Sequence, residues 1–174
     1  YNYTITDSNL CTYTDSVTIT EPSSVLSVNS TQTNVGCNGD STGSVTLYIS
    51  GGTTDYTVNA FGVSVTLPFG LDSVSSSTFF PSGVPAGTYP YIVTDTNGCS
   101  FTDSVTITEP LAISASPTIT NVSCNGDSTG SVTLTLSGGT GTLVEDWGTV
   151  NPAQLSAGTY NYTITDSNLC TYTN

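Results

Sequence analysis

Two kinds of side chain in this sequence could carry chemistry: carboxylates in short polar segments, and cysteines. The carboxylates recur in the motif Asn-Gly-Asp-Ser-Thr-Gly, at Asp40 and Asp127, and in the motif Thr-Asp-x-Asn, at Asp95 and Asp166. Calcium ions are bound by six to eight oxygen atoms from Asp, Asn and backbone carbonyls, so these four residues are candidate Ca²⁺ ligands. The same motifs are typical of tight turns, because Asp and Asn cap their own turns. We favour the turn.

The second kind comprises five cysteines, Cys11, Cys37, Cys99, Cys124 and Cys170. Without His or a CxxC pair a zinc site is not expected, so the sequence predicts disulfides in a secreted protein. Pairing within units joins Cys37 to Cys99 and Cys124 to Cys170, and leaves Cys11 for an upstream partner. However, the first and last loops of an alternating sandwich lie about 25–30 Å apart, whereas a disulfide needs Cα atoms within about 7 Å. The alternative therefore joins neighbouring units, Cys37 to Cys170.

The charge of the chain excludes most enzyme chemistry. Its 174 residues include 13 Asp and Glu and no Lys, Arg or His, which gives a formal net charge of −13. Acid–base catalysis near neutral pH depends largely on His or a tuned Lys, and nucleic-acid binding depends on Lys and Arg. Ser and Thr have no activating base. We expect no enzyme, no catalytic or cofactor-binding residues and no nucleic-acid partner.

One acidic pair stands beside an aromatic residue, at Glu145, Asp146 and Trp147. A glycosidase needs two carboxyl groups on either side of a sugar, but adjacent residues of a strand face opposite ways. We therefore expect Trp147 to be a core residue. A sugar-stacking role is the alternative.

Internal repeats organise the whole chain. Three segments recur with little or no change, which is the mark of tandem repeats. They are YNYTITDSNLCTYT at 1–14 and 160–173, CNGDSTGSVTL at 37–47 and 124–134, and YTDSVTITEP at 13–22 with FTDSVTITEP at 101–110. We predict the C-terminal strands of a preceding repeat at 1–22, a complete repeat at 23–110, and a repeat lacking its last strand at 111–174. Because the sequence starts and stops at equivalent points of the repeat, we expect a longer polymer.

The two larger parts differ in their middle segments, which span 34 positions from Gly52 to Ala86 and 18 from Gly139 to Ala157. The extra residues, near 61–80, contain turn residues and predict an added hairpin.

Alternating apolar and polar residues predict short strands throughout. Val45, Leu47 and Ile49 alternate with Tyr48 and with polar residues. Thr, Val, Ile and Tyr, which favour strands, are abundant, and Gly, Asn, Asp and Pro interrupt the sequence at short intervals. The fold class is therefore all-β, with tandem immunoglobulin-like β-sandwich repeats in an extended rod. Tyr89 and Tyr160, in Gly-Thr-Tyr triplets, are candidates for a tyrosine corner that fixes the strand end; an ordinary core tyrosine is the alternative. No apolar run is long enough to span a bilayer.

Short acceptor patterns predict glycosylation. Asp-Ser followed by an aliphatic residue or Thr is used for O-glycosylation in some surface-living bacteria, and Asn-x-Ser/Thr is the acceptor of N-glycosylation. The O-sites are Ser16, Ser41, Ser73, Ser104 and Ser128, and the N-sites are Asn2, Asn29, Asn121 and Asn161.

The assembled unit resembles the SprB-type repeat of Bacteroidota gliding-motility adhesins and related cell-surface proteins. The resemblance lies in the order C-N-G-x-x-x-G-S-V-x-L, G-G-T, A-G-T-Y, T-D-x-N-G-C and S-V-T-I-T-E-P, and it covers nearly the whole chain. It implies a very long cell-surface filament, exported by a type IX route and used for adhesion or traction. Two positions depart from the family pattern: Thr54-Asp55-Tyr56 replaces the usual Pro-Tyr after G-G-T, and Leu169 replaces the Gly of N-G-C. We expect these departures to affect the geometry of the sheet edge more than the fold.

We therefore predict a non-enzymatic extracellular protein that forms the shaft of a filament or adhesin. Its expected partners are neighbouring repeats of the same polymer, and surface polysaccharide or other cells; calcium is the one cofactor considered. One alternative is an array of carbohydrate-binding modules, which would show Trp147, Tyr48 and Tyr56 as an exposed flat strip. The other is a pilin-like subunit in which residues 12–22 supply the last strand of the unit at 111–174.

Overall fold

The computed structural model describes residues 1–21, 24–53, 55–60, 62–67 and 83–174. This part of the chain contains β-strands and no helix, and every pairing between its strands is antiparallel. The strands are β1 Asn2–Thr6, β2 Thr12–Ser16, β3 Ser27–Thr33, β4 Ser44–Ser50, β5 Tyr56–Ala60, β6 Val63–Leu67, β7 Gly87–Thr94, β8 Ser100–Ile107, β9 Ser114–Thr120, β10 Ser131–Ser137, β11 Val144–Asp146, β12 Thr163–Thr165 and β13 Thr171–Thr173.

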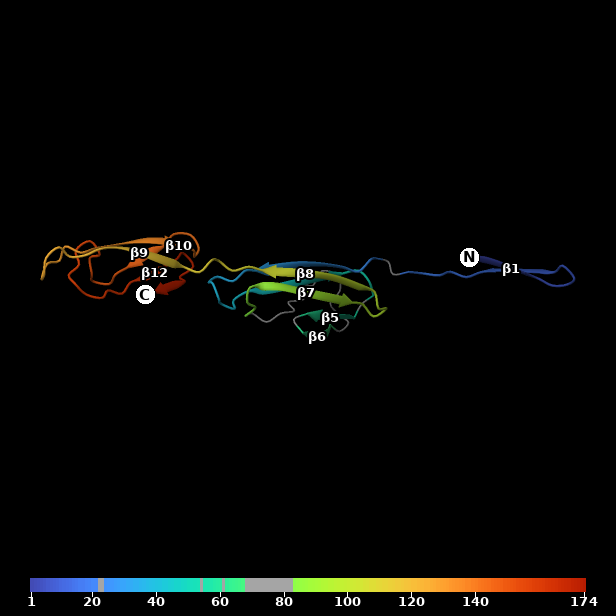
Figure 1. Cartoon of the computed structure of the whole chain (residues 1–174). Helices are drawn as coiled ribbons and strands as arrows, with labels where there is room; N and C mark the ends of the chain where they lie inside the picture. The colour runs from blue at the N-terminus through green and yellow to red at the C-terminus, as the bar shows by residue number, and fades with distance from the viewer. Residues whose placement is uncertain (22–23, 54, 61, 68–82) are drawn as a thin grey trace.

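The strands form three groups that follow one another in Figure 1. The N-terminal hairpin consists of β1 and β2, and every residue from Tyr1 to Glu21 is exposed. We call strands β3–β8 the first repeat and strands β9–β13 the second repeat. No helix that could cross a membrane occurs in the described ranges.

The first repeat contains two sheets that share one core. Strands β3 and β4 form one sheet, and β6, β5, β7 and β8 form the other in that order. The alternation predicted for residues 44–50 is present, because Val45 and Leu47 are buried while Tyr48 is exposed. Val58 and Val93 of the other sheet are also fully buried in the same core.

The last strand of the first repeat connects the two sheets. Strand β8 pairs with β7, and its end also reaches the segment after β3, where the Val35 N–H donates to the Thr108 carbonyl at 3.0 Å. Val105 and Ile107 are buried, whereas Thr106 between them is exposed. The strand therefore closes the core with one face only.

The second repeat follows the same plan with shorter strands. Strands β9 and β10 form one sheet, and β11, β12 and β13 form the other. Its core is smaller and consists of Leu134, Tyr162 and Ile164, with partly buried neighbours that include Trp147.

The hairpin predicted near residues 61–80 is described only in part. Strand β6 pairs with β5 around a turn at Gly62, whose φ of +75° is easily adopted by glycine. Residues 68–82, with the candidate Ser73, lie outside the described residues.

Candidate functional site at the junction between repeats

The Thr-Asp-x-Asn motif forms a turn that is tied to a distant loop. In the first repeat the Asp95 carboxylate accepts the Cys99 N–H at 2.8 Å within its own turn. It also accepts the Thr53 N–H at 3.0 Å, from the G-G-T loop 42 residues earlier. Gly51 and Gly52 have positive φ, and a Cβ on Gly51 would collide with the backbone of Val25. The G-G-T motif thus places an N–H opposite the buried carboxylate.

The second repeat has the same arrangement around Asp166. Its carboxylate accepts the N–H groups of Asn168 at 2.8 Å, Cys170 at 2.9 Å and Thr140 at 2.8 Å. Burial raises the pKa of Asp166, but the N–H groups of Thr140, Cys170 and Asn168 favour the ionised form and bring the pKa below its ordinary value. The N–H of Thr53 is the largest cause of the lowered pKa of Asp95.

All four candidate calcium ligands lie in turns, as the sequence motifs predicted. Asp40 and Asp127 lie in exposed turns, in which their own N–H groups donate to the carbonyls of Cys37 and Cys124. Within the described residues, no cluster of three or more His, Cys, Asp or Glu could hold a metal. Calcium binding by these residues stays a prediction.

A disulfide joins the two repeats. Cys37 follows β3 in the first repeat, Cys170 lies between β12 and β13 in the second, and their Cα atoms are 5.6 Å apart. The pairings within units, Cys37 to Cys99 and Cys124 to Cys170, are absent. The reason lies in β8: its C-terminal end lies beside Cys37, and its N-terminal end follows Cys99, so eight residues of strand separate the two cysteines.

Polar contacts surround this disulfide on both sides. The Asn168 side-chain amide donates to the Gly36 carbonyl at 2.9 Å, and the Asn38 amide donates to the Pro110 carbonyl at 3.0 Å. The Glu109 carboxylate accepts the Gly39 N–H. The sequence pattern did not identify these asparagines as junction residues, although Asn38 directly follows Cys37 and Asn168 lies two residues before Cys170.

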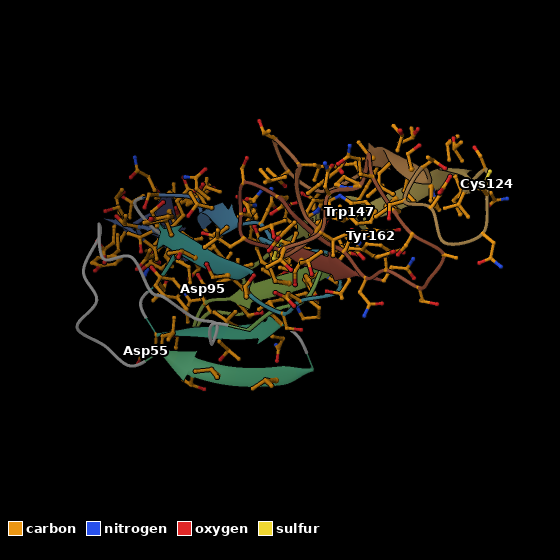
Figure 2. All side chains as sticks on the ribbon, turned by 90° about the vertical axis from the view of Figure 1, so that its left-hand side faces the viewer. Asp55, Asp95, Cys124, Trp147 and Tyr162 are labelled. Carbon is orange, nitrogen blue, oxygen red and sulfur yellow. A yellow bond between two sulfur atoms is a disulfide. The ribbon has the colours of Figure 1, made fainter. Side chains whose placement is uncertain are left out.

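The remaining cysteines, Cys11, Cys99 and Cys124, are free and exposed. Each lies in a turn equivalent to one of the two bonded positions: Cys11 and Cys99 correspond to Cys170, and Cys124 corresponds to Cys37. Figure 2 shows Cys124 on a loop at the edge of the molecule. Their participation in disulfides stays a prediction.

The departure at Leu169 leaves the turn intact. Leu169 has a φ of +66°, close to the +83° of Gly98 at the equivalent position, and Leu10 in the N-terminal hairpin has +67°. A left-handed conformation costs a residue with a side chain about 1–2 kcal/mol. The sheet edge therefore keeps its geometry and stores strain at Leu169.

We predict that Leu169→Gly stabilises the second repeat. The side chain is 80% exposed, so its removal loses little burial, while the strain is relieved. Glycine also increases the entropy of the unfolded chain, which leaves a net gain of about 0.5–1 kcal/mol. Thermal unfolding measures the effect. Thr171→Gly, at an exposed strand position, is the control and should destabilise; a lower melting temperature for Leu169→Gly would contradict the strain.

Both candidate tyrosine corners make the expected bond. The Tyr89 hydroxyl donates to the Pro85 carbonyl at 2.8 Å, and the Tyr160 hydroxyl donates to the Ser156 carbonyl at 3.0 Å. Each bond ties the tyrosine to the backbone four residues upstream, near the start of β7 in the first repeat and ahead of β12 in the second.

The aromatic residues do not form a flat strip. Trp147 lies beside Tyr162 in Figure 2, with ring centroids 5.0 Å apart, and donates its indole N–H to Glu145. Tyr56 packs against the core of the first repeat, and Tyr48 is exposed on the same repeat. Trp147 is thus a partly buried core residue, as predicted. Its neighbour Asp146 accepts the Gly148 N–H, so the carboxylates of Glu145 and Asp146 both form hydrogen bonds within this short segment.

The candidate glycosylation sites that the structure describes are all exposed. They are Ser16, Ser41, Ser104 and Ser128 for O-glycans, and Asn2, Asn29, Asn121 and Asn161 for N-glycans. Modification at these residues stays a prediction.

Two similarly built all-β units joined by a disulfide define a tandem repeat protein. The family model of the SprB repeat matches residues 29–57 and 116–142, one segment in each repeat, so the predicted resemblance is confirmed. SprB repeats occur in cell-surface proteins and are not known as enzymes. No curated protein and no solved structure matches the chain.

Proposed function

We propose that this protein is an extracellular, non-enzymatic structural protein whose repeats form the shaft of a cell-surface filament or adhesin. The observation that carries the proposal is the junction, where the peptide linker and the Cys37–Cys170 disulfide connect the same two repeats. Two covalent connections resist bending between units better than a single linker does. A load-bearing shaft needs this property, whereas a flexible string of binding modules does not.

We further propose that each repeat is an immunoglobulin-like sandwich and that the repeats follow one another as an extended rod. The boundaries are 1–22, 23–110 and 111–174. The shared core of two sheets in the first repeat and the tyrosine corners support the sandwich.

The surface chemistry supports an extracellular role. With no Lys or Arg, the chain offers no site to proteases that cut after those residues. A net charge of −13 keeps neighbouring filaments apart at low salt, and the effect is screened beyond about 8 Å at physiological ionic strength. Partners are other repeats of the polymer, and polysaccharide or other cells at its tip.

Electron microscopy of the native material, labelled with an antibody against this chain, tests the proposal. Long rods at the cell surface with a regular repeat along their length are expected. Label on isolated globular particles, or inside the cell, would contradict it. A glycan array with the purified protein tests the carbohydrate-binding alternative, and binding that is lost in Trp147→Ala with the fold intact would favour that alternative.

A further inference from the structure

The loop after β3 and the linker after β8 meet through two consecutive residues on each side. The Asn38 side-chain amide donates to the Pro110 carbonyl at 3.0 Å. The Gly39 N–H donates to the Glu109 carboxylate at 2.6 Å, which is short for a bond from a backbone N–H. Because the two acceptors belong to adjacent residues, the Asn38 amide and the Gly39 N–H face the same side of the loop.

The sequence Asn38-Gly39 allows a reaction between the side chain and the main chain. In an Asn-Gly pair the glycine nitrogen can attack the side-chain amide carbon, and glycine has no Cβ to hinder this approach. A peptide nitrogen becomes a good nucleophile only when its proton is removed, so the reaction needs a base. A general base must lie within about 2.6–3.2 Å of the atom that carries the proton, and the Glu109 carboxylate meets this requirement.

The pair is also open to water. Asn38, Gly39 and Glu109 are all exposed, and a Cβ on Gly39 would meet nothing within 4 Å beyond its chain neighbours. Ammonia can therefore leave the site, and water can enter it.

We propose that Asn38 is a site of spontaneous deamidation and that Glu109 is the general base of the reaction. Glu109 takes the proton of the Gly39 N–H as the nitrogen forms a bond to Cγ of Asn38. The bond between Cγ and Nδ2 then breaks, and the proton passes to the leaving NH₂ group, which departs as ammonia. Water opens the resulting succinimide ring. The product at position 38 is aspartate, or isoaspartate, in which the main chain runs through the side-chain carbonyl.

A second Asn-Gly pair in the first repeat, Asn97-Gly98, serves as an internal reference. The Gly98 N–H donates to the Asp95 carbonyl at 3.0 Å, and the Asn97 amide donates to the Thr53 hydroxyl at 2.8 Å. A peptide carbonyl is too weak a base to remove the proton. Asn97 should therefore react more slowly than Asn38.

Deamidation of Asn38 changes the junction between the repeats. The amide donates to the linker, whereas an ionised carboxylate can only accept, so its contact with the Pro110 carbonyl becomes repulsive. The new charge also lies close to Glu109. Isoaspartate lengthens the main chain by one carbon next to Cys37, which carries the disulfide. The connection therefore loosens as the protein ages, whether or not the repeats form a shaft.

The rates of deamidation in the folded protein test the proposal. The chain is incubated at about 37 °C and pH 7, then reduced and digested with a protease that cleaves before Asp. This places Asn38 on residues 15–39 and Asn97 on residues 95–102. Mass spectrometry measures the replacement of NH₂ by OH at each site. We expect Asn38 to react at least about tenfold faster than Asn97, because general-base catalysis contributes about 10²–10⁴-fold.

The variant Glu109→Gln separates a base from a merely structural contact. Its amide oxygen can still accept the Gly39 N–H but is not a base, so the rate at Asn38 should fall at least about tenfold while the rate at Asn97 stays unchanged. Glu21→Gln, in the other Glu-Pro pair and also exposed, is the matched control and should change neither rate. In denaturant the parent and Glu109→Gln should react equally, since the contact exists only in the folded chain.

The proposal is overturned if Asn38 reacts no faster than Asn97. It is also overturned if Glu109→Gln keeps or exceeds the parent's rate at Asn38 while circular dichroism shows a folded chain. Asn38→Asp reproduces one product and tests the consequence: small-angle X-ray scattering should show a wider distribution of inter-repeat distances than for the parent, and Asn97→Asp should not. Equal scattering for Asn38→Asp and the parent would contradict the effect on the junction.

Discussion

Replacing Cys37 by Ser is expected to loosen the junction and to destabilise the protein. The disulfide spans 133 residues, and in the chain-entropy model a loop of this length contributes about 5 kcal/mol. The repeats then remain connected by the linker around Pro110 and by a few hydrogen bonds. We expect a lower thermal midpoint and a wider distribution of inter-repeat distances in small-angle X-ray scattering.

Two further variants make this prediction specific to the bond. Cys170→Ser should have the same effect as Cys37→Ser, and the double variant should add nothing, because all three remove one bond. Cys11→Ser, which removes an exposed free thiol, is the control and should behave as the parent. Equal midpoints and equal scattering for Cys37→Ser and the parent would show that the disulfide does not restrain the junction.

Acid is expected to unfold both repeats through Asp95 and Asp166. Hydrogen bonds from backbone N–H groups lower the pKa of both carboxyls in the folded state. A group whose pKa is lower in the folded than in the unfolded state contributes its stability fully above the unfolded value, about 3.9 for Asp. This contribution is lost as the pH falls from there through the folded pKa. Stability should therefore be flat from pH 7 to about 5 and should fall below about pH 4.

Thermal unfolding at pH 7, 5 and 3 measures this dependence, at about 0.5 M salt so that the change in net charge contributes little. Asp166→Asn should lower the midpoint of the second repeat by several degrees at pH 7 and should reduce its pH dependence, because an amide nitrogen cannot accept the Thr140 N–H. Asp127→Asn, at an exposed turn, is the matched control. A midpoint that rises on acidification would mean that relief of charge repulsion outweighs the loss of the turns.

Local sequence pattern was enough to predict the strands, and also the burial or the hydrogen bonds of several individual residues. The alternation around Val45 and Leu47 reports which face is buried, since side chains of a strand point alternately to its two faces. The Gly-Thr-Tyr triplet predicted the bonds of Tyr89 and Tyr160, because that interaction reaches only four residues back.

The junction could not be derived in the same way. The spacing of the cysteines left two pairings open, since a sequence does not say which ends of neighbouring units meet. The bond from Thr53 to Asp95 crosses 42 residues, and only the co-occurrence of G-G-T with T-D-x-N in both repeats hinted at it. The positive φ of Leu169 is likewise imposed by the turn and not by the residue itself.

The carboxylates of Asp95 and Asp166 show how a fold can do without basic side chains. Peptide N–H groups stand in for the ammonium and guanidinium partners that buried acids have in other proteins. Since these amide groups belong to the main chain, substitution of side chains elsewhere does not remove them. The polar side chains then offer hydroxyl, amide and carboxylate groups and no ammonium, guanidinium or imidazolium group. A surface to which this protein adheres through charge must therefore bring the cations itself.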